Sequence, residues 1–583
     1  MAEERVQRRL AAILAADVVG YSRLMEQNEA GTLAALRHLR RSIVNPLVTE
    51  HDGRVVKEMA DGVLVEFGSA VNAVQCAIEL QKRVAAANDS SGDEAPRIDL
   101  RLGINLGDVV VEGDDLYGDG VNLAARLQGL AEPGGICISA KVREEVGRKV
   151  DIEFEDFGEQ QLKNITTPVR VYAIRLGLSL PAAIARPLAL PAKPSVAVLP
   201  FDNLSGDPEQ QYFSDGIAED IITDLSKLSG LFVIARNSAF AYRGRAVNVQ
   251  EVSRALGVRY VLEGSVRKAG NRVRIAAQLI DGATGGHLWA ERYDRDLTDI
   301  FAVQDEVTRE IVSALALKLT KGERRRIERR GTDNLEAYDY FLRGRQLQWQ
   351  RSKEANQEAR PLLERAIELD PHFTRAYAVL ARLHAIDYAN HWRDPPEQSL
   401  RKAQELAQRA VELDDDEPEA HVALGLIMMR QHHLAIAEAR RALALDPNHA
   451  WAHSLLGQAL HYSGRSQDAV EPLQAAIRLD PHDQDPFLHH LARAYFGVGR
   501  YEDAVAVLKR RIIRKPDTDM SRVLLAACYG HLGRVEEARA QWREVMRINP
   551  GYSLEHRRRV APYKDPAHFE LFADGLRKAG LPE

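Results

Sequence analysis

The sequence is poor in cysteine, has no long apolar run and carries no excess of positive charge. Its three cysteines among 583 residues, Cys76, Cys137 and Cys528, are too few and too far apart for a disulfide framework or a thiolate metal site. No stretch reaches the roughly 18 apolar residues that a membrane span needs. A formal net charge of −6 gives no general reason to expect nucleic acid or an anionic membrane as partner. We therefore predict a cytoplasmic protein in a reducing environment.

The amino-terminal run RVQRRLAAILAADVV offers the basic flank, apolar stretch and small residues of a secretion signal. The apolar stretch is short, however, and it ends in Asp17. A buried strand that ends in a functional carboxylate accounts for both features. The sequence therefore favours a strand here over a signal peptide.

The spacing of apolar residues along the sequence predicts several domains. The length of the chain leads to the same expectation, at ~100 to 200 residues per domain. Residues 1–176 alternate strand and helix, and their order βαββαβ predicts an α/β ferredoxin-like sheet with its helices on one face. Residues 177–194 form a Pro/Ala-rich linker, and residues 195–320 form a second α/β domain. Residues 321–333 form a basic linker helix, and residues 334–583 are helical throughout.

The helical part is repetitive. Four prolines, each just after a helical stretch, are spaced 34, 35 and 34 residues apart: Pro447, Pro481, Pro516 and Pro550. Turn glycines and small residues recur between them: Gly464, Gly499, Gly533, Ala469, Ala504 and Ala538. This pattern resembles tetratricopeptide repeats, in which small residues let paired helices pack closely and proline stops the second helix. The resemblance implies an all-α solenoid that binds a protein or peptide partner.

The middle domain begins with the apolar strand SVAVLPF and contains a predicted hairpin about Gly270-Asn271. It resembles the TolB-type amino-terminal α/β domain over some 125 residues, and we find no catalytic constellation in it. The basic stretch KGERRRIERRG that follows could suggest DNA binding, but a solvated helix between two domains is the simpler interpretation.

The stretch LYGDGVNLAAR, residues 116–126, joins a turn to a helix that carries Asn122 and Arg126 on one face. A calcium loop that starts at Asp115 fails, because its twelfth position is Arg126, where a bidentate carboxylate is required. A plain helix start with Asp119 as cap remains possible. An anion site explains more, because a helix start with Asn and Arg one turn apart supplies directed donors for phosphate.

Four stretches in order, LAADVVGYSRLM, VVKEMADGVLVEF, LRLGINLGDV and LYGDGVNLAARLQGLAEPGGICIS, resemble the catalytic domain of class III adenylate and guanylate cyclases. The resemblance implies a metal set of Asp17, Val18 and Asp61 that binds two Mg²⁺ ions, with Mn²⁺ as a possible substitute. It further implies phosphate contacts, in order along the chain, from Gly20, Tyr21, Ser22, Arg101 and Lys163.

The resemblance also implies which residues recognise the base and which act at the reacting phosphate. In this family a lysine and an aspartate recognise adenine, and this sequence has Lys57 and Asp115, so we predict ATP as the substrate. Asn122 and Arg126 correspond to residues that position the ribose and stabilise the transition state. The activity implied is conversion of ATP to 3′,5′-cyclic AMP and pyrophosphate.

The family geometry implies a head-to-tail homodimer in which two protomers share each active site, with output regulated through the repeats. The sequence departs from the usual hairpin motif at Glu58 and Ala60; if position 60 needs a positive φ, Ala60 strains the turn that carries Asp61 by ~1 kcal/mol or more. The alternatives are a guanylate cyclase, or a catalytically weak nucleotide-binding scaffold whose repeats are the working part.

Overall fold

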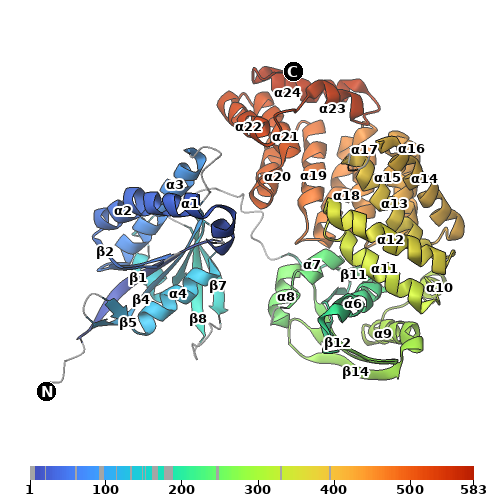
Figure 1. Cartoon of the computed structure of the whole chain (residues 1–583), viewed down its shortest axis with the longest axis horizontal. Coiled ribbons are helices and arrows are strands. Elements are labelled where there is room, and N and C mark those ends of the chain that lie inside the picture. Colours follow the sequence, from blue (N-terminus) through green and yellow to red (C-terminus); the bar gives the residue numbers. More distant parts are fainter. Residues whose placement is uncertain are drawn as a thin grey trace. The chain divides into compact units, whose positions relative to one another are not determined.

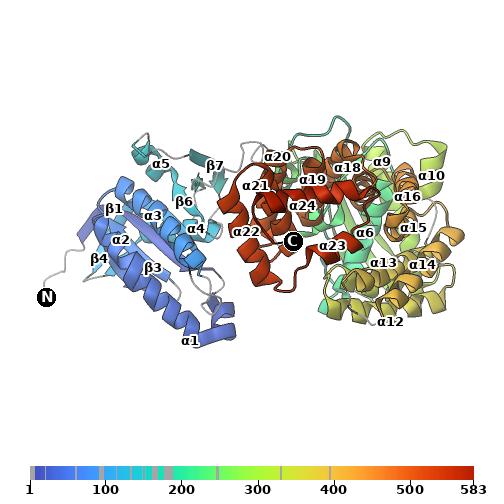
Figure 2. The same ribbon diagram turned by 90° about the horizontal axis from the view of Figure 1, so that it is seen from above.

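The computed structural model divides the chain into two compact units, Met1–Ser179 and Leu180–Glu583, each of which is described by itself (Figures 1 and 2). The structure describes residues 7–19, 21–59, 62–90, 98–112, 115–131, 134–147, 149–150, 153–160, 168–175, 188–244, 248–327, 331–390, 392 and 395–582. Most of the predicted 177–194 linker therefore lies outside the described residues.

The first unit contains a single sheet whose strands follow the order β2-β3-β1-β4-β6-β8-β7, with β5 paired to β4. Its strands are β1 (Gln7–Val18), β2 (Gly53–Glu58), β3 (Gly62–Phe67), β4 (Leu100–Glu112), β5 (Asp115–Tyr117), β6 (Ile136–Ser139), β7 (Glu153–Gln160) and β8 (Val169–Arg175). The predicted hairpin is β2–β3. The order β2-β3-β1-β4 is that of a ferredoxin-like βαββαβ sheet, as the sequence predicts.

Helices cover both faces of this sheet. The helices of the βαββαβ part, α1 (Tyr21–Leu39), α2 (Asn45–Glu50) and α3 (Ala70–Ser90), share a core with Ala12, Leu14 and Ala16 of β1. The alternate β1 residues Ala11, Ile13 and Ala15 pack with Ala124 of α4 (Asp119–Leu130) instead. The expectation of helices on one face therefore holds for α1–α3 but is wrong for α4, which lies below the sheet in Figure 1.

The second unit begins with a sheet of order β11-β9-β12-β13-β14, with β10 paired to β12. Its strands are β9 (Ser195–Val198), β10 (Asp202–Asn203), β11 (Phe232–Val233), β12 (Tyr260–Ala269), β13 (Arg272–Asp281) and β14 (His287–Asp296). The helices of this part are α6 (Gln211–Ser226), α7 (Arg236–Phe240), α8 (Val249–Leu256), α9 (Ile300–Ala314) and α10 (Lys321–Ile327). The β12–β13 turn includes Gly270 at φ +58°, where the sequence predicts a hairpin.

The helical array follows in antiparallel pairs. Its helices are α11 (Leu335–Gln348), α12 (Lys353–Leu369), α13 (Thr374–Ala389), α14 (Pro396–Leu413), α15 (Pro418–Ile427), α16 (His432–Leu445), α17 (Ala450–Tyr462), α18 (Ser466–Leu479), α19 (Asp485–Gly497), α20 (Tyr501–Arg514), α21 (Asp519–His531), α22 (Val535–Ile548), α23 (Leu554–Val560) and α24 (Pro566–Lys578). As predicted, the four spaced prolines follow the ends of α16, α18, α20 and α22. The turn glycines Gly464, Gly499 and Gly533 all have positive φ.

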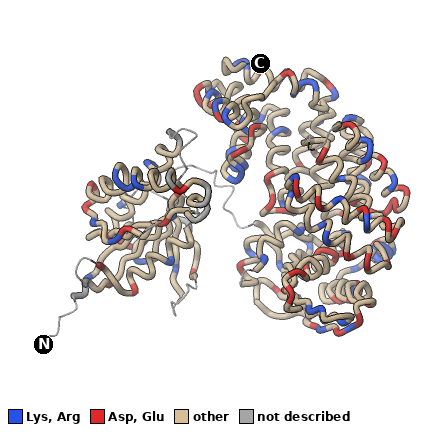
Figure 3. The backbone as a smooth tube through the Cα atoms, in the orientation of Figure 1, with Lys and Arg blue, Asp and Glu red and all other residues tan. Residues whose placement is uncertain are grey.

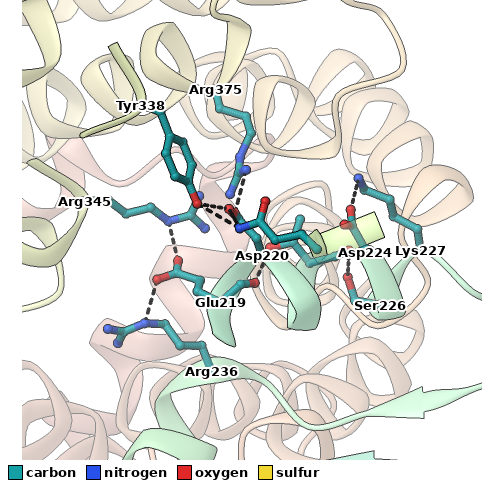
Figure 4. A network of polar contacts seen from close by, with 11 residues as sticks. Glu219, Asp220, Asp224, Ser226, Lys227, Arg236, Tyr338, Arg345 and Arg375 are labelled. Carbon is teal, nitrogen blue, oxygen red and sulfur yellow. Dashed lines mark hydrogen bonds and ion pairs between the residues drawn. The ribbon is translucent and has the colours of Figure 1, made fainter. Parts of the chain in front are cut away.

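The second sheet and the helical array form one body because a buried polar network joins them (Figure 4). Asp220 of α6 accepts hydrogen bonds from the Tyr338 hydroxyl, from Gln304 Nε2 at 3.2 Å and from Arg375 Nη1 at 2.8 Å. Tyr338 and Arg375 belong to α11 and α13. Breaking such a network would leave buried charges unpaired, so the parts resist separation.

A second set of contacts joins the sheet to the loop between α16 and α17. Asn448 Nδ2 donates to the Ser226 carbonyl at 2.8 Å and to the Leu231 carbonyl at 3.0 Å. Ser226 Oγ donates to Asp446 at 2.7 Å. The repeat loop that carries Pro447 is therefore a docking point for the middle domain.

The basic stretch is helical as α10 over the part that the structure describes. It is not wholly solvated, because Glu323 is buried and accepts from the backbone N–H groups of Ser229 and Thr320, both at 2.8 Å. Among the described residues, no helix combines the length and apolarity needed to cross a membrane.

Candidate active site

The first cluster of predicted site residues surrounds Asp17, at the carboxyl end of β1. The strand register places Asp17 directly across from Gly62 on one side and Arg101 on the other. Arg101 Nη2 lies 2.6 Å from Asp17 Oδ2, and Gln128 Nε2 of α4 donates to the same oxygen at 3.2 Å. Arg101, expected to contact phosphate, is thus paired with the carboxylate expected to bind metal.

Asp61 lies outside the described residues, and the residue after it, Gly62, is the first described residue of β3. Gly62, the next residue, opposes Asp17 in the sheet. Arg40 holds this end of the hairpin by donating to the carbonyls of Met59 and of Gly62, the latter at 3.3 Å. No local motif singles out Arg40 or Gln128, because each makes a contact that is distant along the chain.

The backbone after Asp17 leads into the first turn of α1, which begins at Tyr21. Val18 is buried in the sheet, and the Val19 N–H donates to the Asp99 carbonyl at 2.9 Å. A helix start provides N–H groups without intrahelical partners, which suits an anion. Three of the predicted contacts lie outside what the structure describes: Gly20, Lys163 and the side chain of Ser22.

The predicted base-recognition pair comes together. Lys57 Nζ of β2 lies 2.7 Å from Asp115 Oδ2 of β5, although the two residues are far apart in sequence. The Tyr117 hydroxyl and the Leu116 N–H also donate to Asp115, at 3.1 and 3.0 Å. Hydrogen bonding to Lys57 lowers the pKa of Asp115 and raises the pKa of Lys57. Both groups are therefore charged at neutral pH.

The predicted catalytic pair lies on the outer face of α4. Gly120, Ala124 and Leu127 of this helix are buried, whereas Asn122 and Arg126 are exposed. Within the described residues, the Asn122 and Arg126 side chains have neither a hydrogen-bond nor an ion-pair partner, so both are available to a ligand. The residue that caps the start of the helix is Gly118, at φ +115°, and not Asp119, the cap in the alternative interpretation of this stretch.

Close packing of α4 on β4 fixes where this pair stands. A Cβ on Gly103 of β4 would lie 2.1 Å from Gln128 N and 2.3 Å from Ala124 O. A Cβ on Gly120 would lie 2.9 Å from Asp108 O. Since real side chains do not tolerate such contacts with backbone, glycine at these positions sets the depth of α4 on the sheet.

The donor set around Asp17 fits a hard divalent cation. The described residues contain no group of three or more His, Cys, Asp and Glu that could hold a metal ion. Asp17, however, already draws a cationic group to 2.6 Å, and the chain returns beside it at Gly62, directly after a second carboxylate. Carboxylate oxygens such as those of Asp17 are the donors that Mg²⁺ and Mn²⁺ prefer.

Comparison with known proteins supplies further findings. The family model of the adenylate and guanylate cyclase catalytic domain matches residues 5–175, and two tetratricopeptide repeat models match residues 429–484 and 460–524. A putative adenylate cyclase 3 of Rhizobium meliloti is 53% identical, with 100% of each chain covered. An adenylate cyclase of Streptomyces coelicolor is 34% identical over 26% of this chain and 37% of its own. A solved adenylate/guanylate cyclase/hydrolase from Silicibacter pomeroyi shares 43% identity over 29% of this chain and 98% of its own, with a TM-score of 0.28.

Proposed function

Because the chain belongs to the adenylate and guanylate cyclase family, we propose that it converts ATP to 3′,5′-cyclic AMP and pyrophosphate. The observation that carries this proposal is the 2.7 Å pair of Lys57 and Asp115, because a donor beside an acceptor matches the edge of adenine. Lys57 donates to a ring nitrogen and Asp115 accepts from the exocyclic amine. Guanine carries hydrogen on the corresponding ring nitrogen, so it would leave both groups badly paired.

Asp17, the Val18 carbonyl and Asp61 hold two divalent ions, with Mg²⁺ as the resident metal and Mn²⁺ as a substitute. The bound metal supplies Lewis acidity for the ribose 3′-hydroxyl and neutralises the departing pyrophosphate. Arg101, which pairs with Asp17, would contact a phosphate oxygen of the bound nucleotide. Backbone N–H groups at Gly20, Tyr21 and Ser22, together with Lys163, hold the phosphates.

Asn122 and Arg126 complete the site from another protomer. Asn122 orients the ribose so that its 3′-hydroxyl faces the α-phosphate, and Arg126 donates to the oxygens on which charge develops. Both side chains are exposed on α4 and lack partners among the described residues, which suits a target in a second chain. A two-fold homodimer makes two such shared sites.

The second unit regulates this activity. The repeats bind a protein or peptide partner, and the middle domain, of the TolB-type class on sequence grounds, is attached to them through Asp220 and Asn448. A partner on the repeats therefore acts on the middle domain and the repeats as one rigid body.

The test is the cyclisation assay on the purified full chain with Mg·ATP, Mn·ATP and Mg·GTP. We expect cyclic AMP from both ATP complexes and little cyclic GMP. Lys57→Glu combined with Asp115→Ser should move the preference toward GTP, because the donor becomes an acceptor. No cyclic nucleotide under any condition, with ATP still bound, would support the scaffold alternative instead, and the Glu58 and Ala60 departures would explain it.

A further inference from the structure

The strand β14 ends the second sheet, and its outer edge is open. In the described part of the second unit it pairs with β13 alone, and it runs along the lower border of that unit in Figure 1. Its ten residues, His287–Asp296, include no proline, and Leu288, which is 41% exposed, lies at a β-bulge where the register with β13 shifts. A long unpaired edge of this kind is a template for another strand.

The faces of β14 limit how a second copy could pair with it. Trp289 and Tyr293 face the core, opposite Leu279 and Ile275 of β13, so from Trp289 onward, beyond the bulge, the odd-numbered residues form the inner face. If a two-fold axis normal to the sheet relates the two β14 strands, the inner faces of both strands lie on the same side of the joined sheet. Odd-numbered residues of one strand then lie opposite odd-numbered residues of the other, and even-numbered residues lie opposite even-numbered ones. Antiparallel registers centred on a residue satisfy this condition.

Both acidic and basic residues lie at the lower border of the second unit (Figure 3), and their charges select one register among those that pair most of β14. A centre at Glu291 or at Arg292 would set like charges directly against each other, and a centre at Ala290 opposes no unlike charges. A centre at Tyr293 sets Arg292 opposite Asp294 and Glu291 opposite Arg295, twice each. It alone brings unlike charges together without pairing like ones.

We propose that β14 pairs antiparallel with β14 of a second copy of this chain, centred on Tyr293, so that two second units share one continuous sheet. Arg292, which has no ion-pair partner among the described residues, gains Asp294 of the partner, a carboxylate that Arg272 and Arg274 of its own sheet already contact. The partner is a second copy because the complementarity is between the strand and itself. Dimerisation of the cyclase units, which belongs to the proposed function, would raise the local concentration and let a modest contact form.

Directed disulfide formation tests the register in the full chain. We would make Ala290→Cys with Asp296→Cys, because residues 290 and 296 oppose each other across the proposed axis. They lie about 20 Å apart within one extended strand, too far for an internal bond. The native cysteines are all buried, so they should not compete. We expect disulfide-linked dimers under mild oxidation.

Three further variants test the register and the charges and provide the controls. Ala290→Cys with Asp294→Cys would link only in the register centred on Arg292, so we expect no dimer from it. Adding Arg292→Glu to the linking variant sets it against Asp294 and should slow cross-linking roughly tenfold. Adding His287→Glu instead places the same charge on the same strand outside the paired residues and should leave the rate unchanged.

The cross-linking results and the activity of the same samples test the β14 dimer and the proposed function separately. Equal linking by both cysteine variants, or by neither, would overturn the proposal; in the second case the charges on β14 would serve only to keep the edge unpaired. Cyclic AMP formation in the same samples separates the two hypotheses. Activity without β14 cross-linking leaves the proposed function standing, and cross-linking without activity leaves the β14 dimer standing.

Discussion

At the scale of single residues, Arg126 is the sharpest test of the proposed chemistry. It is exposed on α4 and holds no described residue in place, so Arg126→Ala should leave folding unchanged. Turnover should fall by roughly 10² to 10³, because one donor to the developing charge is lost. Cyclic AMP assays measure the turnover of the variant, and thermal melts measure whether its folding is unchanged. Near-normal activity would remove Arg126 from the catalytic role.

Asp480 predicts a pH dependence of stability. This carboxyl is 1% exposed, accepts from the Ser238 hydroxyl, and burial raises its pKa to about 7. Since an unfolded aspartate titrates near 3.9, the folded chain holds the extra proton between about pH 4 and pH 7. The free energy of unfolding therefore decreases as pH rises through that window.

Asp480→Asn removes the titrating group while keeping an acceptor for Ser238. We expect this variant to be more stable than the parent at pH 8, by roughly 2 kcal/mol, and close to it at pH 5. Denaturant melts at both values test this prediction. An equal effect at the two pH values would mean that Asp480 is ionised throughout.

At the scale of elements, the contact between β4 and α4 links packing to chemistry. Gly103→Ala would place a methyl against the backbone of Gln128 and Ala124, so α4 must move away from the sheet. We expect a loss of about 1 to 3 kcal/mol in unfolding free energy. Turnover should also fall, because displacement of a catalytic helix by about an ångström can cost ~10² in rate.

Gly129→Ala is the matched control on the same helix. A Cβ there meets nothing within 4 Å, so stability should hold or rise slightly and turnover should stay at the parental level. If both alanine variants lose the same activity, the close approach at Gly103 is not the cause.

Local patterns predicted most elements but not their long-range partners. The β2–β3 and β12–β13 hairpins and the proline-terminated helices follow from periodicity and turn residues, which are properties of short stretches. By contrast, Lys564 N donates to the Tyr462 carbonyl at 2.9 Å and Arg493 donates to the Tyr563 hydroxyl. These contacts fold the carboxyl-terminal segment back on earlier repeats, and nothing in the local sequence specifies them.

In the candidate site too, local motifs predict individual residues but not the contacts between distant parts of the chain. Motifs predict roles for Lys57, Asp115, Asn122 and Arg126, because family resemblance carries residue types at fixed positions, and these roles stay predictions. The pairing of Asp17 with Gln128, like the anchoring of the hairpin by Arg40, depends on how separate strands and helices meet. The placement of α4 on the second face likewise follows from the alternation of β1 together with the glycines of β4.

At the scale of the whole molecule, the chain is two units rather than a row of independent domains. If the second unit regulates the first, residues 1–179 and the full chain should differ in specific activity, in dimerisation, or in both. Cyclic AMP assays and sedimentation over a range of concentrations compare them. Identical rates and identical dimerisation would remove the regulatory role.

The central claim is that one protomer supplies the metal carboxylates and another supplies the catalytic arginine. The direct measurement mixes Asp17→Ala chains with Arg126→Ala chains, each nearly inactive alone, and assays cyclic AMP. We predict recovery to about a quarter of the parental activity, because about half of the dimers are mixed and each keeps one intact site of two. Inactivity of the mixture, with mixed dimers shown to form, would contradict the shared site.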